Sequence, residues 1–434
     1  MLDVLKGKSF TIYTLGCKVN QYESDSMEDI LKVNGAHAVS FDEPADIVII
    51  NTCAVTNMAE KKSRQIIHRA RKKNPEAVCV ACGCYVQSGK EILEKDETVD
   101  IIVSNNRKKD IARILEEYFE GSQIVDNYID INKTNEYESL FLYKPTEHTR
   151  AYVKVQDGCN NFCTYCIIPF TRGRIRSRAL NEVIEEIKGL AANGIKEVVV
   201  TGINLPSYMD NAGNGLKELI LEVAKIEGII RVRMGSLEPR VITKDFLDAI
   251  SKEEKVCPHF HLSLQSACNE TLKRMNRKYT IEEYMDKCNL IRQYYEKPAI
   301  TTDIIVGFPG ETKEEFETTY NNLEILNLYE MHVFKYSRRN GTIAADMDNQ
   351  VSEDVKNERS DRLIEMAKRH KKNYEELFKG EKVTILAEEY EVKKEAGICR
   401  FILKGHTERY IYVDKEFSED FCKNNINNLV DIIM

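Results

Sequence analysis

The strongest constraint on the fold of this 434-residue chain is a repeated alternation of short β-branched segments with helical patterns. In the first 120 residues, three apolar segments are typical of strands, and two longer segments have the apolar spacing of helices. The strand candidates are residues 10–16, 45–52 and 77–83, and the helix candidates are residues 19–35 and 58–74. Because βαβ connections place helices over both faces of a parallel sheet, residues 1–120 are predicted to form a parallel-sheet α/β domain.

A second alternation follows a segment without clear periodicity, residues 121–144, which is predicted to be a linker. Six strand candidates separated by helical stretches predict an incomplete (β/α)6 barrel at residues 145–372. In such barrels the chemistry lies at the C-terminal ends of the strands. The strand candidates are residues 151–158, 196–202, 230–236, 258–265, 299–308 and 329–336, with helices at 181–193 and 312–326 among the connections.

The last part of the chain, residues 373–434, is predicted to be a small all-β domain. A charged helical segment at 352–379 leads into strand candidates at residues 382–391, 397–406 and 409–416. The size suits an OB-like barrel of the kind that binds oligonucleotides, and a β-rich packing cap is the alternative. The overall fold class is therefore α/β with a C-terminal β domain.

The composition predicts a cytoplasmic protein. No apolar run is long enough to span a bilayer, and the first residues lack the apolar core of a signal peptide. The chain has 13 cysteines, and disulfides are rare in the cytoplasm. Metal ligation or catalysis is therefore the expected role of some of them.

Three cysteines form a C-x3-C-x2-C run directly after the first barrel strand: Cys159, Cys163 and Cys166. A tetrahedral zinc site and a fully thiolate-ligated [4Fe–4S] cluster each need four ligands. Three thiolates hold three irons of a cubane and leave the fourth open to chelate a small molecule. A structural zinc site is the alternative to this interpretation.

A second trio lies at the ends of the three N-terminal strand candidates: Cys17, Cys53 and Cys84. Ligands of open α/β sheets gather outside the carboxyl ends of the strands, so three thiols at that edge predict a metal site. Cys79 and Cys82 complicate this assignment. If strand alternation continued through residue 84, Cys82 and Cys84 would point the same way, so Cys82 is an alternative ligand.

The run of Cys159, Cys163 and Cys166, with an aromatic residue before the last cysteine, resembles the radical S-adenosylmethionine (SAM) enzymes. In that family the amino and carboxyl groups of SAM fill the open corner of a [4Fe–4S] cluster. An electron from the cluster then cleaves SAM to a 5′-deoxyadenosyl radical. The resemblance implies the same cofactors and catalytic role for these three cysteines.

The whole chain resembles the methylthiotransferase family through "TLGCKVNQYES", "NTCAVTN", "GCYVQ", "TRGRIRSR" and "LQSACNETLKRMNR". The resemblance implies a second [4Fe–4S] cluster on Cys17, Cys53 and Cys84, and its GCY pattern favours Cys84 over Cys82. It implies that one SAM methylates a cluster-bound sulfur and another provides the radical. It also implies a C-terminal RNA-binding TRAM domain, an electron donor of flavodoxin or ferredoxin type, and a sulfur source.

The motifs "TLGCKVN", "CNNFCTYCIIPFTRGR" and "TGINL" are most similar to the branch of the family that acts on threonylcarbamoyladenosine. The implied reaction is C2 methylthiolation of N6-threonylcarbamoyladenosine at position 37 of tRNA. A sister enzyme acting on isopentenyladenosine or on a ribosomal protein is the nearest alternative. An RNA-binding protein with structural clusters, and a radical SAM enzyme that forms no carbon–sulfur bond, are the others.

Residues at the ends of the barrel strands are candidates for SAM contacts: Asn204, Ser236, Glu238, Gln265 and Gly307. By resemblance, Asn204 would hold the amino group of SAM. Ser236 and Glu238 would face the ribose or methionine end, and Gly307 would let the backbone approach the adenine. Ordinary turn chemistry is the alternative for each.

Two basic stretches stand out against a net charge of −8. Residues 61–73 are interpreted as a solvated helix face. The arginine row at 172–178 is expected to contact phosphates or the substrate carboxylate. Three histidines, His68, His259 and His261, are interpreted as surface or packing residues.

Overall fold

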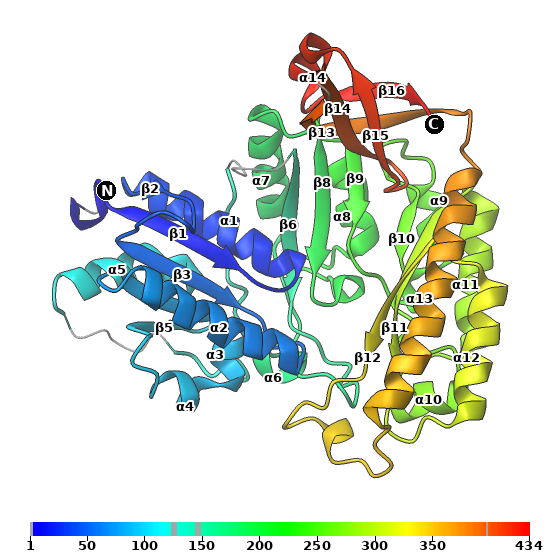
Figure 1. The fold of residues 1–434 in the computed structure, drawn as a ribbon, viewed down its shortest axis with the longest axis horizontal. Helices are drawn as coiled ribbons and strands as arrows, with labels where there is room; N and C mark the ends of the chain where they lie inside the picture. The colour runs from blue at the N-terminus through cyan, green and yellow to red at the C-terminus, as the bar shows by residue number, and fades with distance from the viewer. Residues whose placement is uncertain (1–2, 123–127, 144–148, 396–397) are drawn as a thin grey trace.

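The computed structural model describes residues 3–122, 128–143, 149–395 and 398–434. Three units are visible in Figure 1: an N-terminal sheet, an open barrel, and a C-terminal sheet at one end of the barrel. Parts of the predicted linker 121–144 and of the strand candidate 397–406 lie outside the described residues. Among the residues that the structure describes, no helix is both long and apolar enough to cross a membrane.

The N-terminal unit is a five-stranded parallel sheet in the order β2-β1-β3-β4-β5, which confirms the predicted architecture. Apolar clusters cover both of its faces, one around Phe10, Met27 and Ile49, the other around Ile50 and Ile67. The short strands β2 and β5 were not predicted. The strands are β1 (Ser9–Thr14), β2 (His37–Ala38), β3 (Ile47–Thr52), β4 (Val78–Gly83) and β5 (Ile101–Val103). The helices are α1 (Lys18–Val33), α2 (Asn57–Lys73), α3 (Cys84–Ser88), α4 (Lys90–Leu93) and α5 (Ile111–Phe119).

The central unit contains all six predicted parallel strands. Bridges Val232–Val256 and Leu237–Leu262 join its two halves. Within the described ranges β12 does not pair with β6, so the barrel is open between these two strands. Helix α1 of the N-terminal unit packs against β6. The strands are β6 (Arg150–Asp157), β8 (Glu197–Gly202), β9 (Arg231–Met234), β10 (His259–His261), β11 (Ala299–Val306) and β12 (Glu330–Lys335), with β7 (Arg176–Ser177) antiparallel to β6. The helices are α6 (Ile168–Thr171), α7 (Leu180–Ala192), α8 (Leu216–Ala224), α9 (Lys244–Ile250), α10 (Asn269–Arg274), α11 (Ile281–Tyr294) and α12 (Lys313–Leu326).

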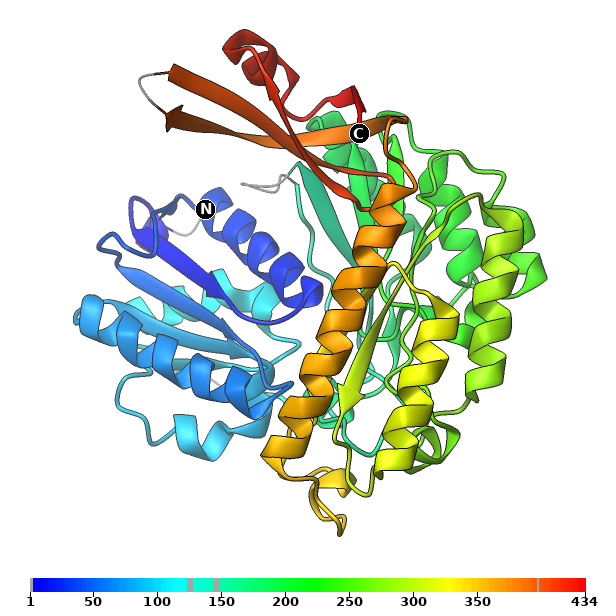
Figure 2. The ribbon, with the colours of Figure 1, turned by 45° about the vertical axis from the view of Figure 1, so that its right-hand side comes forward.

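A long helix, α13 (Glu353–Glu376), packs against β12 and leads to the C-terminal sheet (Figure 2). It runs across the predicted boundary between residues 372 and 373. The C-terminal unit is a curled antiparallel sheet in the order β15-β14-β13-β16, which confirms the predicted β domain. Its elements are β13 (Lys382–Glu395), β14 (Ile398–Thr407), β15 (Tyr412–Phe417), α14 (Glu419–Asn425) and β16 (Leu429–Ile433).

Buried polar contacts join the units. In the described part of the predicted linker, residues 128–143 form no helix or strand, yet the backbone carbonyl of Leu140 accepts a hydrogen bond from the Tyr22 hydroxyl at 2.6 Å. At the N-terminal ends of the barrel strands, Arg231 and Arg233 donate to the carbonyls of His406 and Glu408, each at 2.9 Å. The C-terminal sheet is thereby held against the barrel.

Candidate functional site

The N-terminal cysteine trio lies at one edge of the parallel sheet. Cys17 precedes α1, Cys53 follows β3, and Cys84 is the first residue of α3. Two glycines shape this edge. Gly83 has φ +91°, and a Cβ on it would lie 2.4 Å from the carbonyl oxygen of Thr52. Gly16 has φ +105°, and a Cβ on it would lie 3.0 Å from the Sγ of Cys53. Glycine is therefore required for the chain to bring the thiols together.

The three thiols influence one another electrostatically. Burial raises the pKa of Cys53 to about 11, and Cys84 and Cys17 add to the effect. Desolvation by the surrounding wall of the cavity also raises the pKa of Cys17, and the charge of Arg172 acts in the opposite direction. A bound cationic metal reverses this by favouring thiolates. Three converging thiols, with Arg172 Nε donating to Cys84 Sγ at 3.2 Å, fit a [4Fe–4S] cluster with one iron free of cysteine.

The other two cysteines of this unit lie apart from the trio. Cys82 packs with Phe10 on the opposite face of the sheet from Cys84, because the strand ends at Gly83 and alternation stops there. The inference from alternation that Cys82 and Cys84 point the same way is therefore wrong. Cys79 lies near the start of β4, and burial raises its pKa to about 12. The charged groups that act on this thiol are Arg71, Asp100 and Asp96, and none of them is a cysteine of the trio.

The second cysteine loop follows β6 and is fixed by backbone hydrogen bonds. The amide of Cys159 donates to the carbonyl of Gly173 at 3.0 Å, and that of Cys166 donates to Cys163 at 2.9 Å. Gly158 has φ +73° and approaches Arg174 so closely that a Cβ would lie 1.8 Å from its carbonyl oxygen. The loop is thus folded tightly by contacts that only this backbone allows.

Donors approach the sulfurs of this loop as they do in the N-terminal trio. The amide of Asn161 lies 3.5 Å from Cys159 Sγ, and Arg277 Nη1 lies 3.4 Å from Cys163 Sγ. Burial raises the pKa of Cys166 to about 12, with the neighbouring Cys163 adding to it. Three thiols with nearby donors again fit a cluster that has one open iron.

A cavity of about 130 Å³ adjoins this loop, and all three cysteines line it. Four of the five predicted SAM-contacting residues line it as well: Asn204, Ser236, Glu238 and Gln265. They come from the C-terminal ends of successive barrel strands, as the barrel rule predicts.

Gly307 is not among the residues that line this cavity. Its amide donates to the Glu311 carboxylate at 3.0 Å, and a Cβ on it would lie 2.3 Å from the Cγ of Lys356. Its φ is +69°. The structure therefore explains this glycine by the packing of α13, and its contact with SAM stays a prediction.

A larger cavity of about 600 Å³ occupies the inside of the open barrel. All three units contribute to its wall, with Cys17 and Lys18 from the N-terminal unit and Tyr410 from the C-terminal one. It shares three lining residues with the smaller cavity: Ile168, Ile203 and Ser236. The large cavity therefore extends from Cys17 to the wall of the cavity above Cys159, Cys163 and Cys166.

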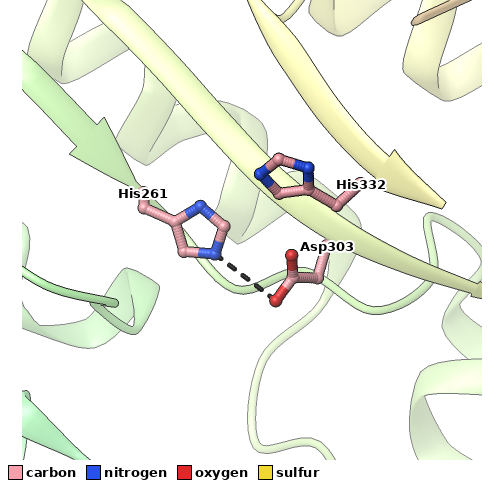
Figure 3. A group of neighbouring side chains, drawn as sticks. All are labelled: His261, Asp303 and His332. Atoms are coloured by element: carbon pink, nitrogen blue, oxygen red, sulfur yellow. Dashed lines mark ion pairs between the residues drawn. The ribbon is translucent and has the colours of Figure 1, made fainter. Parts of the chain in front are cut away.

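Histidines line the barrel side of the large cavity. His259, His261 and His332 all belong to its wall. Figure 3 shows His261 and Asp303 pointing toward each other, with His332 beside them, and the His261 Nε2–Asp303 Oδ2 distance is 3.4 Å. His259 is buried with its ring centroid 5.3 Å from that of Tyr410, so it packs as predicted, and His68 is exposed beside Asp96. The interpretation of His261 stays a prediction.

The arginine row has a structural role at three of its positions. Arg172, Arg176 and Arg178 are buried. Arg172 pairs with Glu23 and Asp157, and Arg178 pairs with Glu186. The expectation that this row contacts phosphates or substrate is therefore wrong for these three, because buried carboxylates already neutralise them.

Sequence reasoning missed several residues of the large cavity, notably Lys18, His332 and Tyr410. The position of Lys18 next to Cys17 was an available signal. His332 belongs to a predicted strand, but which face of that strand points inward depends on its register with β11. Tyr410 reaches the cavity from the C-terminal unit, and its sequence carries no sign of that contact.

Two family models match the chain: "Radical SAM superfamily" over residues 153–323 and "Uncharacterized protein family UPF0004" over residues 9–104. The chain is 40% identical over 411 residues to the threonylcarbamoyladenosine tRNA methylthiotransferase MtaB of Bacillus subtilis (strain 168), covering 94% of this chain and 90% of the relative. It is 39% identical to the MtaB of Aquifex aeolicus (strain VF5), covering 86% and 91%. It is also 40% identical to the tRNA-2-methylthio-N(6)-dimethylallyladenosine synthase of Thermodesulfovibrio yellowstonii, covering 84% and 83%.

Solved structures share the fold. The radical SAM methyltransferase TsrM from Kitasatospora setae superposes with a TM-score of 0.56 at 15% identity, covering 76% of this chain and 72% of that one. The extensive identity to curated relatives agrees with the two cysteine trios, one at the edge of the N-terminal sheet and one after β6. The chain belongs to the radical SAM family of tRNA methylthiotransferases.

Proposed function

We propose that this protein adds a methylthio group to C2 of N6-threonylcarbamoyladenosine at position 37 of tRNA. The observation that carries the proposal is the continuous cavity between Cys17 and the wall above the second cysteine loop. A base of the single-stranded anticodon loop can be splayed out into such a cavity. Relatives that cover nearly the whole chain bear the corresponding enzyme name.

Cys159, Cys163 and Cys166 would hold one [4Fe–4S] cluster, and Cys17, Cys53 and Cys84 would hold the other. When bound, these groups and SAM supply the reductive chemistry and the sulfur for transfer. Asn204, Ser236, Glu238 and Gln265 would orient SAM in the small cavity.

Residues of the protein hold charged groups in place beside the cysteines and shield the site from water. Arg277 is held by Tyr279, whose hydroxyl accepts a hydrogen bond from Nε at 2.8 Å, so its guanidinium stays close to Cys163. Ile168 and Ile203 form the apolar partition between the two cavities. Exclusion of water by such apolar walls protects reactive species.

The proposal includes partners and domains. tRNA would contact the C-terminal unit, residues 373–434, which we assign as a TRAM domain. Residues 1–120 would form the auxiliary-cluster domain, residues 121–144 the linker, and residues 145–372 the radical SAM barrel. An electron donor of flavodoxin or ferredoxin type and a sulfur source complete the system.

The test is nucleoside mass spectrometry after anaerobic incubation of the reconstituted protein. The mixture contains SAM, a reductant, sulfide and tRNA bearing threonylcarbamoyladenosine. We expect a methylthio adduct on that base, and no adduct from a Cys17→Ala variant. Adduct formation only on another acceptor contradicts the substrate assignment. Absence of both adduct and SAM cleavage, with both clusters intact, contradicts the enzyme assignment.

A second candidate is a sister activity on isopentenyladenosine, because the dimethylallyladenosine synthase of T. yellowstonii is as identical to this chain as the Bacillus enzyme is. The same assay with isopentenyladenosine-bearing tRNA separates the two. We expect no adduct on that substrate.

A further inference from the structure

Lys18 is a basic side chain in the wall of the large cavity that has no counter-ion among the described residues. Its side chain is exposed to the cavity. In the part of the chain that the structure describes, its ammonium group makes no hydrogen bond and no ion pair. The acids whose charges reach it are engaged elsewhere: Glu197 with Arg233 at 3.0 Å, and Asp303 with His261 at 3.4 Å.

Strands β10, β11 and β12 of the barrel add further polar side chains to the cavity wall near Lys18. Strand register pairs His261 with Thr301 and Asp303 with His332, so their side chains lie on one face of the sheet (Figure 3). His261 is held through both ring nitrogens, with Nδ1 2.9 Å from Thr301 Oγ1 and Nε2 3.4 Å from Asp303 Oδ2.

The imidazole of His332, in contrast, makes no hydrogen bond or ion pair with another described residue. Its ring centroid lies 6.0 Å from that of His261. Its ring nitrogens remain for a ligand.

Basic side chains lie around His259, in the wall of the large cavity. Burial lowers the pKa of His259 well below its usual value. The charges of Arg233 and Lys18 lower this pKa further. The one acid of the cavity wall itself, among the described residues that line it, is Glu330, and Lys371 pairs with it at 2.8 Å. The cavity is therefore suited to an anionic group on its ligand.

A carboxylate placed in an enclosed site needs a cation and hydrogen-bond donors to offset its desolvation. Lys18 and His332 supply these, while Val19 and Met234 provide apolar wall. The volume, about 600 Å³, lies within the range of small-molecule sites. We propose that Lys18 and His332 form a carboxylate-binding subsite for the N6-threonylcarbamoyl group of the substrate base, with Asp303 positioning His261 beside them. This inference rests on the proposed function.

The subsite gives a physical basis for substrate choice. An isopentenyl group has no charge, so it would cover the ammonium of Lys18 without giving it a partner. A threonylcarbamoyl group brings the missing carboxylate. Because Lys18 directly follows Cys17, the contact also fixes the base near the N-terminal cysteine trio.

The experiment measures binding by the anaerobically reconstituted full chain, using fluorescence anisotropy. The probes are an anticodon stem–loop RNA with threonylcarbamoyladenosine at position 37 and the same RNA with that carboxylate converted to a methyl ester. We expect the wild-type protein to favour the acid. Lys18→Met should weaken binding of the acid about tenfold and leave the ester unchanged, because one charge-assisted contact is lost.

Three further variants sharpen the test. Lys18→Arg keeps the charge and should retain the preference for the acid. His332→Phe should weaken binding of the acid alone. Lys225→Met is the matched control, since Lys225 pairs with Glu222 at 2.6 Å and is not part of the cavity wall, and it should change neither affinity.

The outcomes separate the subsite from the proposed function. Equal binding of acid and ester by the wild-type protein overturns the subsite, as does an unchanged preference in both Lys18→Met and His332→Phe. In either case, methylthiolation of the same RNA by the wild-type protein shows that the proposed function survives. Iron content is measured for each variant, and if Lys18→Met loses iron, His332→Phe decides.

Discussion

The guanidinium group of Arg172 donates a hydrogen bond from Nε to the Sγ of Cys84 at 3.2 Å, and it also pairs with the buried carboxylate of Glu23. Arg172 belongs to the barrel, whereas Cys84 and Glu23 belong to the N-terminal sheet unit. The amide of Cys159 donates to the carbonyl of Gly173, the next residue after Arg172. One short segment therefore connects the two cysteine trios and fixes the position of one relative to the other.

Replacing Arg172 with methionine should destabilise the protein by about 3 kcal/mol, because it removes a buried guanidinium that pairs with Glu23. Lys108 and Lys154 still pair with Glu23, which keeps the loss at the lower end for a broken buried pair. The measurement is denaturant unfolding under anaerobic conditions. Arg69→Met is the control, since Arg69 pairs with Asp42 on the surface, and its effect should stay below about 1 kcal/mol. Equal effects of the two variants would contradict the role given to Arg172.

Iron content should follow the two cysteine trios separately. Wild-type protein should hold about eight irons, and replacing either trio with alanine should leave about four. Cys79→Ala and Cys82→Ala should retain the wild-type content, because neither thiol lies with a trio. Iron analysis with electron paramagnetic resonance checks this, and loss of iron in Cys82→Ala would reverse the choice of Cys84.

The affinity for SAM should depend on the residues of the small cavity. Glu238→Gln and Asn204→Ala should each weaken SAM binding about tenfold, as expected for the loss of a polar contact to a charged ligand. Equilibrium dialysis with the cluster-loaded protein measures the dissociation constant. Glu218→Gln, on the outer helix α8, is the control and should leave the constant unchanged. Wild-type affinity in both cavity variants would remove these residues from the site.

Gly307→Ala should reduce stability more than Gly194→Ala does. Both glycines have positive φ, +69° and +89°, so both substitutions strain the backbone by about 1 kcal/mol. Only at Gly307 would the new methyl group meet Lys356, whereas nothing lies within 4 Å at Gly194. Thermal unfolding compares the two, and equal losses would show that α13 accommodates the methyl group.

Acidification should weaken the joint between the barrel and the C-terminal sheet. Burial alone would raise the pKa of Glu197, but Arg233, Arg150 and Arg231 outweigh it and hold this pKa below its usual value. A lowered folded-state pKa means that the stabilisation is complete above the unfolded value of about 4.3 and is lost as the pH falls through the folded value. Unfolding measured between neutral pH and pH 3 should show this loss, and Glu197→Gln should flatten it. A Glu197→Gln profile parallel to wild type would contradict the linkage.

Local patterns were enough to predict the fold class. Strand and helix periodicity is a property of short segments, so all six barrel strands and the three long N-terminal strands were predicted correctly. The C-x3-C-x2-C loop is likewise local, whereas Cys17, Cys53 and Cys84 come together only through the packing of three strands. Four of the five predicted SAM-contacting residues line the expected cavity, because strand ends of a barrel always meet at the same face.

Contacts between distant segments were decided only by the tertiary structure. The arginine row has the sequence of an anion-binding loop, but Glu23 and Asp157 neutralise Arg172 because α1 and β6 pack together. The register of β11 with β12 sets His332 beside Asp303 in the cavity. The sequence by itself determined which elements form and where the cysteines lie. The folded arrangement decided which charges are neutralised by partners and which, like Lys18, face the cavity without one.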